Sequence, residues 1–287
     1  MSIWNLWSSL TLFRVMGLPV QVHTTFLVFP AGFLVGAGWR YAGWRGVAEG
    51  LVLLVVLGVS GLLHEFAHIL VARRYGCATR RVLLMPIGFM ADMECLPREP
   101  YEIWMATAGP AVSAILGGLA VWCSSLIGEP ETRLLESVQM FLSVAGFFNL
   151  GMAGFNMIPW FPMDGGRVLR SVLALMIGWG LPLQACRAHV VATRIVVRYV
   201  GRPMAMAAVA ATVFYTHAWF HLLLVGFLIV AGEAEFLLTR EREYETRWQS
   251  MLSFLPQTGG EREGRSRRQR EPRLQGIEVC VGLTQEV

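Results

Sequence analysis

The stretch VAEGLVLLVVLGVSGLLHEFAHILVA, residues 47–72, decides the fold because it is long and apolar enough to cross a membrane. A helix needs about 20 predominantly apolar residues to span a hydrocarbon core roughly 30 Å thick. The whole chain has the same character, since 55% of its 287 residues are hydrophobic and only 15% are charged. A typical soluble domain carries about 25% charged residues. We therefore predict an all-α polytopic membrane protein.

Other apolar stretches predict the remaining spans. Residues 24–38, 103–127 and 138–158 each have the composition of a membrane helix, although the first is short. Residues 188–231 fit either one long span beside an interfacial basic helix, or two spans joined near 215–219. We favour two, which gives about six transmembrane helices.

The distribution of charge predicts the orientation. The helix at 47–72 is followed at once by four arginines, which are Arg73, Arg74, Arg80 and Arg81. Basic residues beside a helix end mark the cytoplasmic side of a membrane. The loop GEPETRLLES, between the third and fourth spans, is short and net acidic, as expected of the outer side. Both chain ends are therefore expected on the cytoplasmic side.

Residues 80–95 predict a small membrane-associated β-hairpin, because a Pro86 to Gly88 turn separates two apolar runs too short to span. Residues 1–23 predict an interfacial N-terminal segment, as either a short helix or an irregular stretch. The helix is suggested by apolar residues at helical spacing, Trp4, Trp7, Leu10 and Phe13.

Residues 239–287 predict a polar, disordered cytoplasmic tail, because they are rich in glycine and in charges of both signs. The five cysteines are scattered and form no CxxC pair, so neither a disulfide nor a cysteine metal site is expected. They are Cys77, Cys95, Cys123, Cys186 and Cys280.

The sequence HEFAH at residues 64–68 carries the chemistry. Residues i and i+4 share one face of a helix, so His64 and His68 can bind one zinc ion. Glu65 is then placed to act as a general base. Ionisable residues inside a membrane are costly and mark functional sites. The pattern predicts a metal site with a base beside it.

A third ligand is needed, since catalytic zinc usually has three protein ligands. The candidate is Asp164 in the stretch NMIPWFPMDGGR, residues 156–167, where prolines and glycines break a membrane helix. From the residues alone, Asp164 is equally well explained as a capping residue for a helix that begins near Gly165.

HEFAH on the second span and NMIPWFPMDGGRVLR after the fourth together resemble the site-2 protease family, the M50-type intramembrane zinc metalloproteases. Further matches are GLPVQVHTTF at 17–26 and AGPAVSAILG at 108–117. The resemblance implies a transmembrane metalloprotease domain at 24–238, with one Zn²⁺ held by His64, His68 and Asp164. It implies Glu65 as the catalytic acid/base, Asn156 near the reacting centre, and a hairpin that holds substrate extended.

The resemblance also sets expectations about partners and place. We expect a membrane-spanning protein as substrate, the lipid bilayer as surroundings and no nucleic acid as partner. The expected place is the cell membrane, with the active site toward the cytoplasm. Two departures stand out: Ser113 replaces an asparagine common in the family, and neither a PDZ domain nor a CBS pair is visible.

A zinc transporter or metal sensor is the rival reading. A transporter needs ligands on several spans, whereas the strong candidates here lie at one depth beside a glutamate. The second histidine pair, His217 and His221, lacks that glutamate, and we expect it to pack at a helix end.

Overall fold

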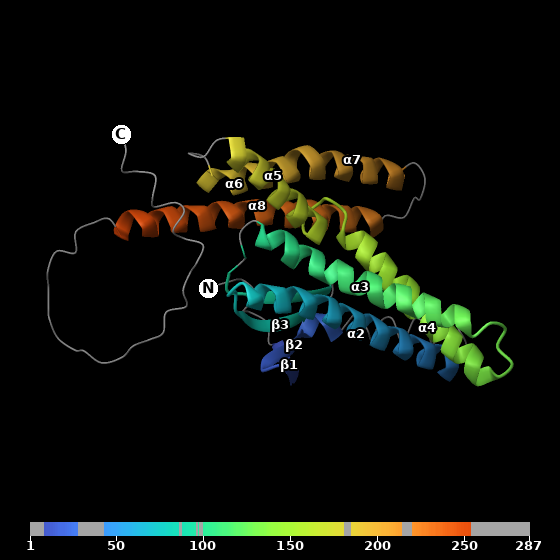
Figure 1. The fold of residues 1–287 in the computed structure, drawn as a ribbon. Coiled ribbons are helices and arrows are strands. Elements are labelled where there is room, and N and C mark those ends of the chain that lie inside the picture. The colour runs from blue at the N-terminus through green and yellow to red at the C-terminus, as the bar shows by residue number, and fades with distance from the viewer. Residues whose placement is uncertain are drawn as a thin grey trace, which may run out of the picture. The chain divides into compact units, whose positions relative to one another are not determined.

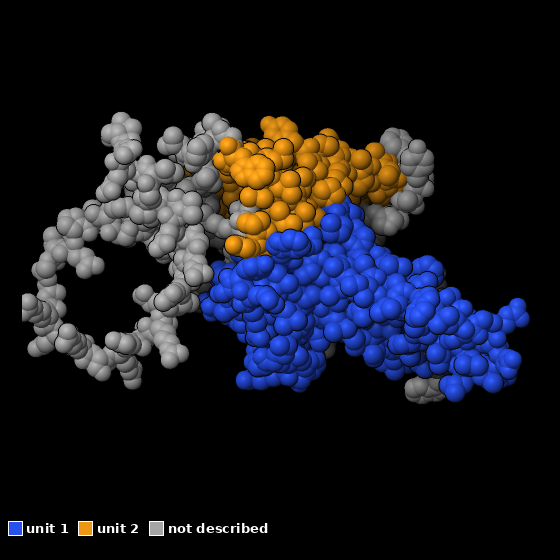
Figure 2. All heavy atoms as spheres, viewed as in Figure 1, with its two compact units in different colours: residues 1–97, 104–158 blue, residues 98–103, 159–287 orange. Residues whose placement is uncertain are grey.

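The structure is a computed structural model that describes residues 9–27, 43–85, 88–95, 97, 100–180, 185–213 and 220–253. It divides into two compact units (Figure 2). Unit 1 comprises Met1–Pro97 and Trp104–Ile158, and unit 2 comprises Arg98–Ile103 and Pro159–Val287.

Three long helices form the membrane part of unit 1: α2 (Trp44–Arg74), α3 (Tyr101–Leu126) and α4 (Arg133–Asn156). Within the described residues, these are the helices long and apolar enough to cross a membrane, which confirms the three spans predicted there. Their outward side chains are apolar, with Trp104, Ile115 and Phe147 among the most exposed. A hydrocarbon solvent accounts for such surfaces without a protein partner. The predicted span at 24–38 lies mostly outside the described residues.

Small residues allow α3 and α4 to pack closely. A Cβ added at Gly117 would lie 2.8 Å from the backbone nitrogen of Leu150 and 2.9 Å from the carbonyl oxygen of Gly146. Such small-residue contacts drive helix association where the hydrophobic effect cannot. Buried polar bonds add to them: Asn149 Nδ2 donates to Ser60 Oγ at 2.8 Å, which joins α4 to α2.

A four-stranded sheet completes unit 1, in the order β1 (Ser9–Val15), β2 (Leu18–His23), β3 (Thr79–Met85), β4 (Gly88–Met93). β2 and β3 pair in parallel, whereas β1–β2 and β3–β4 are antiparallel hairpins. The hairpin predicted near 80–95 is therefore confirmed.

One face of the sheet packs on the C-terminal half of α2 (Figure 1). Leu18, Val20 and Val82 share a core with Phe66 and Ile69 of α2. Gln21, Arg81 and Asp92 are linked side chain to side chain, so the sheet also carries a polar ladder. The sheet is thus held against the helix that carries the HEFAH sequence.

A helix at the N-terminus was the wrong expectation for residues 9–23, which form two strands. The turn explains the difference: Val15 pairs with Leu18, and both loop residues have positive φ, 52° at Met16 and 82° at Gly17. A two-residue loop with both φ values positive matches the twist of a hairpin. Residues 1–8 lie outside the described residues.

Unit 2 is helical, with α5 (Asp164–Gly180), α6 (Ala185–Ile195), the π-helical stretch η4 (Val196–Gly201), α7 (Arg202–Ala211) and α8 (Phe220–Ser253). α7 ends at Ala211 and α8 begins at Phe220. The predicted junction near 215–219 lies outside the described residues, so the two-span reading of 188–231 stays a prediction. α8 continues through Ser253, so residues 239–253, assigned above to the polar tail, are helical. Residues 254–287 lie outside the described residues.

An ion-pair network is buried in unit 2. Arg170 of α5 pairs with Glu102 and, at 2.8 Å, with Glu235 of α8; Ser171 Oγ donates to Glu102 at 2.6 Å. The Arg170 and Glu102 side chains are fully buried. A buried guanidinium is tolerated only when carboxylates satisfy it. The network fixes α5, whose first residue is Asp164.

Candidate metal centre

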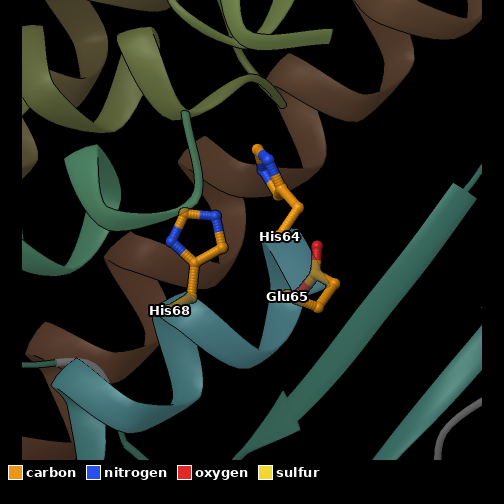
Figure 3. A group of neighbouring side chains, drawn as sticks. All are labelled: His64, Glu65 and His68. Carbon is orange, nitrogen blue, oxygen red and sulfur yellow. The ribbon is translucent and has the colours of Figure 1, made fainter. Parts of the chain in front are cut away.

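His64, Glu65 and His68 project from neighbouring turns of α2 (Figure 3). Their possible ligand atoms all lie within 4.8 Å of one another, and the two imidazole rings meet edge to face. Both histidines are buried, at 5% and 3% exposure, whereas Glu65 is half-buried. The spacing of HEFAH therefore produces the predicted cluster.

α3 fixes how the two rings are oriented. The Nδ1 atom of His68 lies 2.7 Å from the carbonyl oxygen of Met105, and that of His64 lies 2.9 Å from Ser113 Oγ. A carbonyl oxygen only accepts, so Nδ1 of His68 carries the proton and Nε2 has the lone pair. Such partners orient metal-binding histidines and raise their basicity. The same arrangement suits His64, with Ser113 as acceptor.

Gly109 of α3 leaves room at the two Nε2 atoms. A Cβ added there would lie 2.3 Å from Nε2 of His68 and 2.7 Å from Nε2 of His64. Zinc binds imidazole nitrogen at about 2.0–2.1 Å. A side-chain carbon at Gly109 would thus collide with both Nε2 atoms, so glycine leaves their lone pairs accessible. Two imidazole nitrogens held open in this way fit a zinc ion.

Gly109→Ala should therefore lower zinc affinity at least ~10-fold, because the added carbon displaces the two imidazole rings. Gly118→Ala is the matched control on the same helix, because a Cβ there meets nothing within 4 Å. Metal analysis of the two purified variants checks this. Equal zinc content in both would contradict the assignment.

Ser113→Ala should weaken zinc binding by about 10–100-fold, the usual effect of removing a partner of a metal-binding histidine. Ser113→Asn should retain more affinity, because an amide oxygen can also accept from Nδ1 of His64. Ser125→Ala serves as control, since Ser125 is exposed and donates only to its own helix. Zinc competition with a chromogenic chelator measures all three.

Asn156 is the last residue of α4 and Asp164 is the first residue of α5. Asp164 is the first residue of α5 and is buried, with 7% exposure, in unit 2. Gly166 is required beside it, because a Cβ there would lie 2.8 Å from the backbone carbon of Trp160. Asn156 ends α4 in unit 1, and its Nδ2 donates to the Met152 carbonyl at 2.9 Å. Their predicted roles stay predictions.

Sequence reasoning missed Gly109 and Met105 as parts of the site, and it named Ser113 only as a departure. It also missed a disulfide: Cys77 and Cys95 are bonded to each other, which corrects the expectation of unpaired cysteines. The detectable signal was position, because the two cysteines flank the predicted hairpin. His217 lies outside the described residues, and the side chain of His221 is not described.

Comparison with known proteins agrees with this geometry. Residues 125–200 match the sequence model of Peptidase family M50. A zinc metalloprotease of Methanocaldococcus jannaschii is 36% identical over 173 residues, 60% of this chain and 47% of that protein. Rip3 of Mycobacterium tuberculosis is 31% identical over 256 residues, 84% of this chain and 60% of that protein. The chain thus spans about half the length of these relatives.

A solved structure has the same fold. The site-2 protease from Methanocaldococcus jannaschii superposes with a TM-score of 0.53 and 29% identity, covering 80% of this chain and 95% of that one. The chain is similar to the site-2 protease family.

Proposed function

We propose that the protein is an intramembrane zinc metalloprotease that hydrolyses peptide bonds of membrane-spanning proteins. One observation carries the proposal: two buried histidines, oriented by α3, face the space left by Gly109 and stand beside Glu65 on an apolar helix. A metal site used only for structure would be closed by four protein ligands and would have no need of a base.

The ligand set of the proposal is His64, His68 and Asp164, holding one zinc per chain. Support for Asp164 comes from its place in the NxxPxxPxDGG motif and from its fixed position at the start of α5. Phe161, three residues earlier, is fully buried in a core with Val196 and Phe236. A carboxylate held this firmly is suited to ligate a metal.

Glu65 performs the proton transfers. His64 and His68 would hold a zinc ion, which would supply a Lewis acid to polarise the scissile carbonyl and to lower the pKa of water toward about 7. Glu65 accepts the proton of the attacking water and passes it to the leaving amine. Asn156 is our candidate donor to the developing oxyanion, because its amide nitrogen has a second N–H besides the one that it donates to the Met152 carbonyl.

Substrate must be extended before it is cut, because a membrane helix shields its peptide bonds with its own hydrogen bonds. β4 is an edge strand of the sheet and can accept an added strand. Phe89 of β4 packs on Gly61 of α2, where a Cβ would lie 2.4 Å from the ring, and Gly61 is one turn before Glu65. Strand addition to β4 would present a carbonyl beside the base.

A zinc transporter is less well supported. Transport requires metal ligands spaced along a path, whereas the described part of the chain holds one such group, at His64, Glu65 and His68. The glutamate inside that group has a use in hydrolysis.

The protein is proposed to lie in the cell membrane with about six spans and its active site toward the cytoplasm. Three parts are proposed: an interfacial segment at 1–23, the catalytic membrane domain from 24, and a polar tail, which now begins after Ser253, where α8 ends. Arg73 and Arg74 at the end of α2 support the orientation.

A reporter fused after residue 260 tests the orientation. With both ends in the cytoplasm, a reporter that is active only outside the cytoplasm should give no signal there, and one fused in the loop near residue 130 should give a strong one. The reverse pattern would show that the spans are oriented the other way.

Co-expression with a panel of single-span membrane proteins tests the activity. The native chain should produce fragments that are missing when Glu65→Gln replaces it at equal expression. Fragments that persist with Glu65→Gln come from another protease, and a panel in which no fragment depends on Glu65 would count against the proposal.

A further inference from the structure

The Cys77–Cys95 disulfide closes the open end of the β3–β4 hairpin. Cys77 precedes β3 and Cys95 follows β4, and the backbone nitrogen of Glu94 donates to the Ala78 carbonyl just inside the bond. The hairpin is therefore tied at its base by a covalent link. β4, the edge strand proposed above to take substrate, is one of the two strands that this link secures.

The end of α2 brings Cys77 to this place. Gly76, with φ of 82°, ends the helix in a left-handed turn, and the backbone nitrogen of Cys77 donates to the Ala72 carbonyl at 3.0 Å. This is the glycine-dependent stop that leads a chain out of a helix. Cys77 is thus fixed to the last turns of the helix that carries His64 and His68.

The disulfide also packs against Met105, which orients a histidine of the metal centre. Cys77 shares a buried core with Ala72 and Met105, and Cys95 packs against the same core. Met105 provides the carbonyl oxygen, 2.7 Å away, that orients the His68 ring. Met105 therefore packs with Cys77 and also orients His68. A change at the sulfurs is thus expected to affect both the hairpin and the orientation of the His68 ring.

The disulfide lies at the edge of the core, since Cys77 is buried and Cys95 is half-buried. An open pocket of about 220 Å³ is lined by Arg73, Gly76, Cys77, Ala78 and Thr79. Disulfides on the cytoplasmic side of a membrane are usually transient and redox-sensing, because thiols there are kept reduced.

We propose that Cys77 and Cys95 form a reversible redox switch that raises the zinc affinity and the cleavage rate of this site when oxidised. The proposal rests on the function and orientation proposed above. The oxidised state is the one in which the hairpin is tied and His68 meets Met105. Without the bond, the hairpin is held by its backbone hydrogen bonds and by packing, and no covalent link ties its open end.

The exchange is balanced by a thiol such as glutathione. A glutathione thiolate attacks one sulfur and forms a mixed disulfide, and a second glutathione releases it. The Cys77 and Cys95 thiols form while glutathione disulfide leaves, and the reverse reaction restores the bond.

The test uses the full chain with Cys123, Cys186 and Cys280 replaced by Ser, so that the pair alone reacts. The protein is equilibrated in glutathione buffers across the cytoplasmic range, and its thiols are counted by alkylation and mass spectrometry. Zinc affinity is measured in the same samples by chelator competition. Cleavage of a reconstituted single-span substrate, once one is known, is measured beside it.

Reduction should lower zinc affinity about tenfold, the lower end of the effect of losing a group that orients a metal-binding histidine. Reoxidation of the same protein should restore the zinc affinity. A chain that also carries Cys77→Ser and Cys95→Ser should match the reduced form and ignore the buffer, and a chain with Cys123→Ser alone should behave as native.

A pair that stays bonded throughout the cytoplasmic range, or that never forms a bond, would overturn the switch. So would equal zinc affinity in both states. These results would leave the proposed hydrolase standing. If zinc-loaded protein cleaved no membrane substrate in either state, the hydrolase would be in difficulty, while thiol counts and zinc affinity would still decide the switch.

Discussion

Glu65→Gln should leave zinc bound and lower the cleavage rate by about 10²–10⁴-fold, the usual range for loss of a general base. Glutamine keeps the size and hydrogen-bonding capacity of the side chain but takes no proton at neutral pH. His64 and His68 keep their contacts with Ser113 and Met105, so the metal site is unchanged. Zinc analysis and cleavage of a reconstituted substrate, on the same preparation, measure both quantities.

Glu94→Gln is a suitable control for this change. This substitution also replaces a carboxylate with a neutral amide. Glu94 lies beside β4 and forms an exposed ion pair with Arg80. Exposed pairs contribute little to stability, so this variant should cleave at the native rate. Near-native cleavage by Glu65→Gln with zinc in place would rule out Glu65 as the base.

His64→Ala and His68→Ala should each lose most of the bound zinc and with it the activity. Each removes one of two neutral nitrogen ligands, and loss of a ligand weakens a zinc site far more than loss of an orienting partner. These variants should resemble Glu65→Gln by activity and differ from it by metal content. Asp164→Asn should likewise lose bound zinc and activity, since it removes the charge of the proposed third ligand.

The control is His189→Ala, a histidine of α6 in unit 2 that the proposed site does not include. Its zinc content should stay at the native level. Stoichiometric zinc in both His64→Ala and His68→Ala would mean that the metal is held elsewhere.

The features predicted from sequence are those in which the pattern is local. HEFAH places two histidines on one face of a helix whatever surrounds them, and a run of 26 residues such as 47–72 can span a membrane on length and composition. The β3–β4 hairpin follows from its Pro–Gly turn. Asp164 is assigned as a ligand through the resemblance of its motif to that of the M50 family, and the spacing of the residues alone does not predict this role.

The features missed depend on contacts between distant segments. Ser113 and Met105 are 49 and 37 residues from the histidines they orient. The sequence pattern of α3 does not predict that this helix approaches α2 at Gly109. The strand β1 was misread because Leu10 and Phe13 keep helical spacing, while pairing with β2 decides the structure. Propensity is a weak guide where such pairing is available.

The central claim is that zinc at this cluster carries out hydrolysis within the membrane. It is tested most directly by removing all metal from the purified chain in liposomes and restoring zinc in steps, while cleavage of a single-span substrate is followed. The account predicts no cleavage without zinc and a rate that rises in proportion to bound zinc until one ion per chain is reached. Cleavage by the metal-free chain, or full zinc loading of the active site without cleavage of any membrane-spanning substrate, would contradict it.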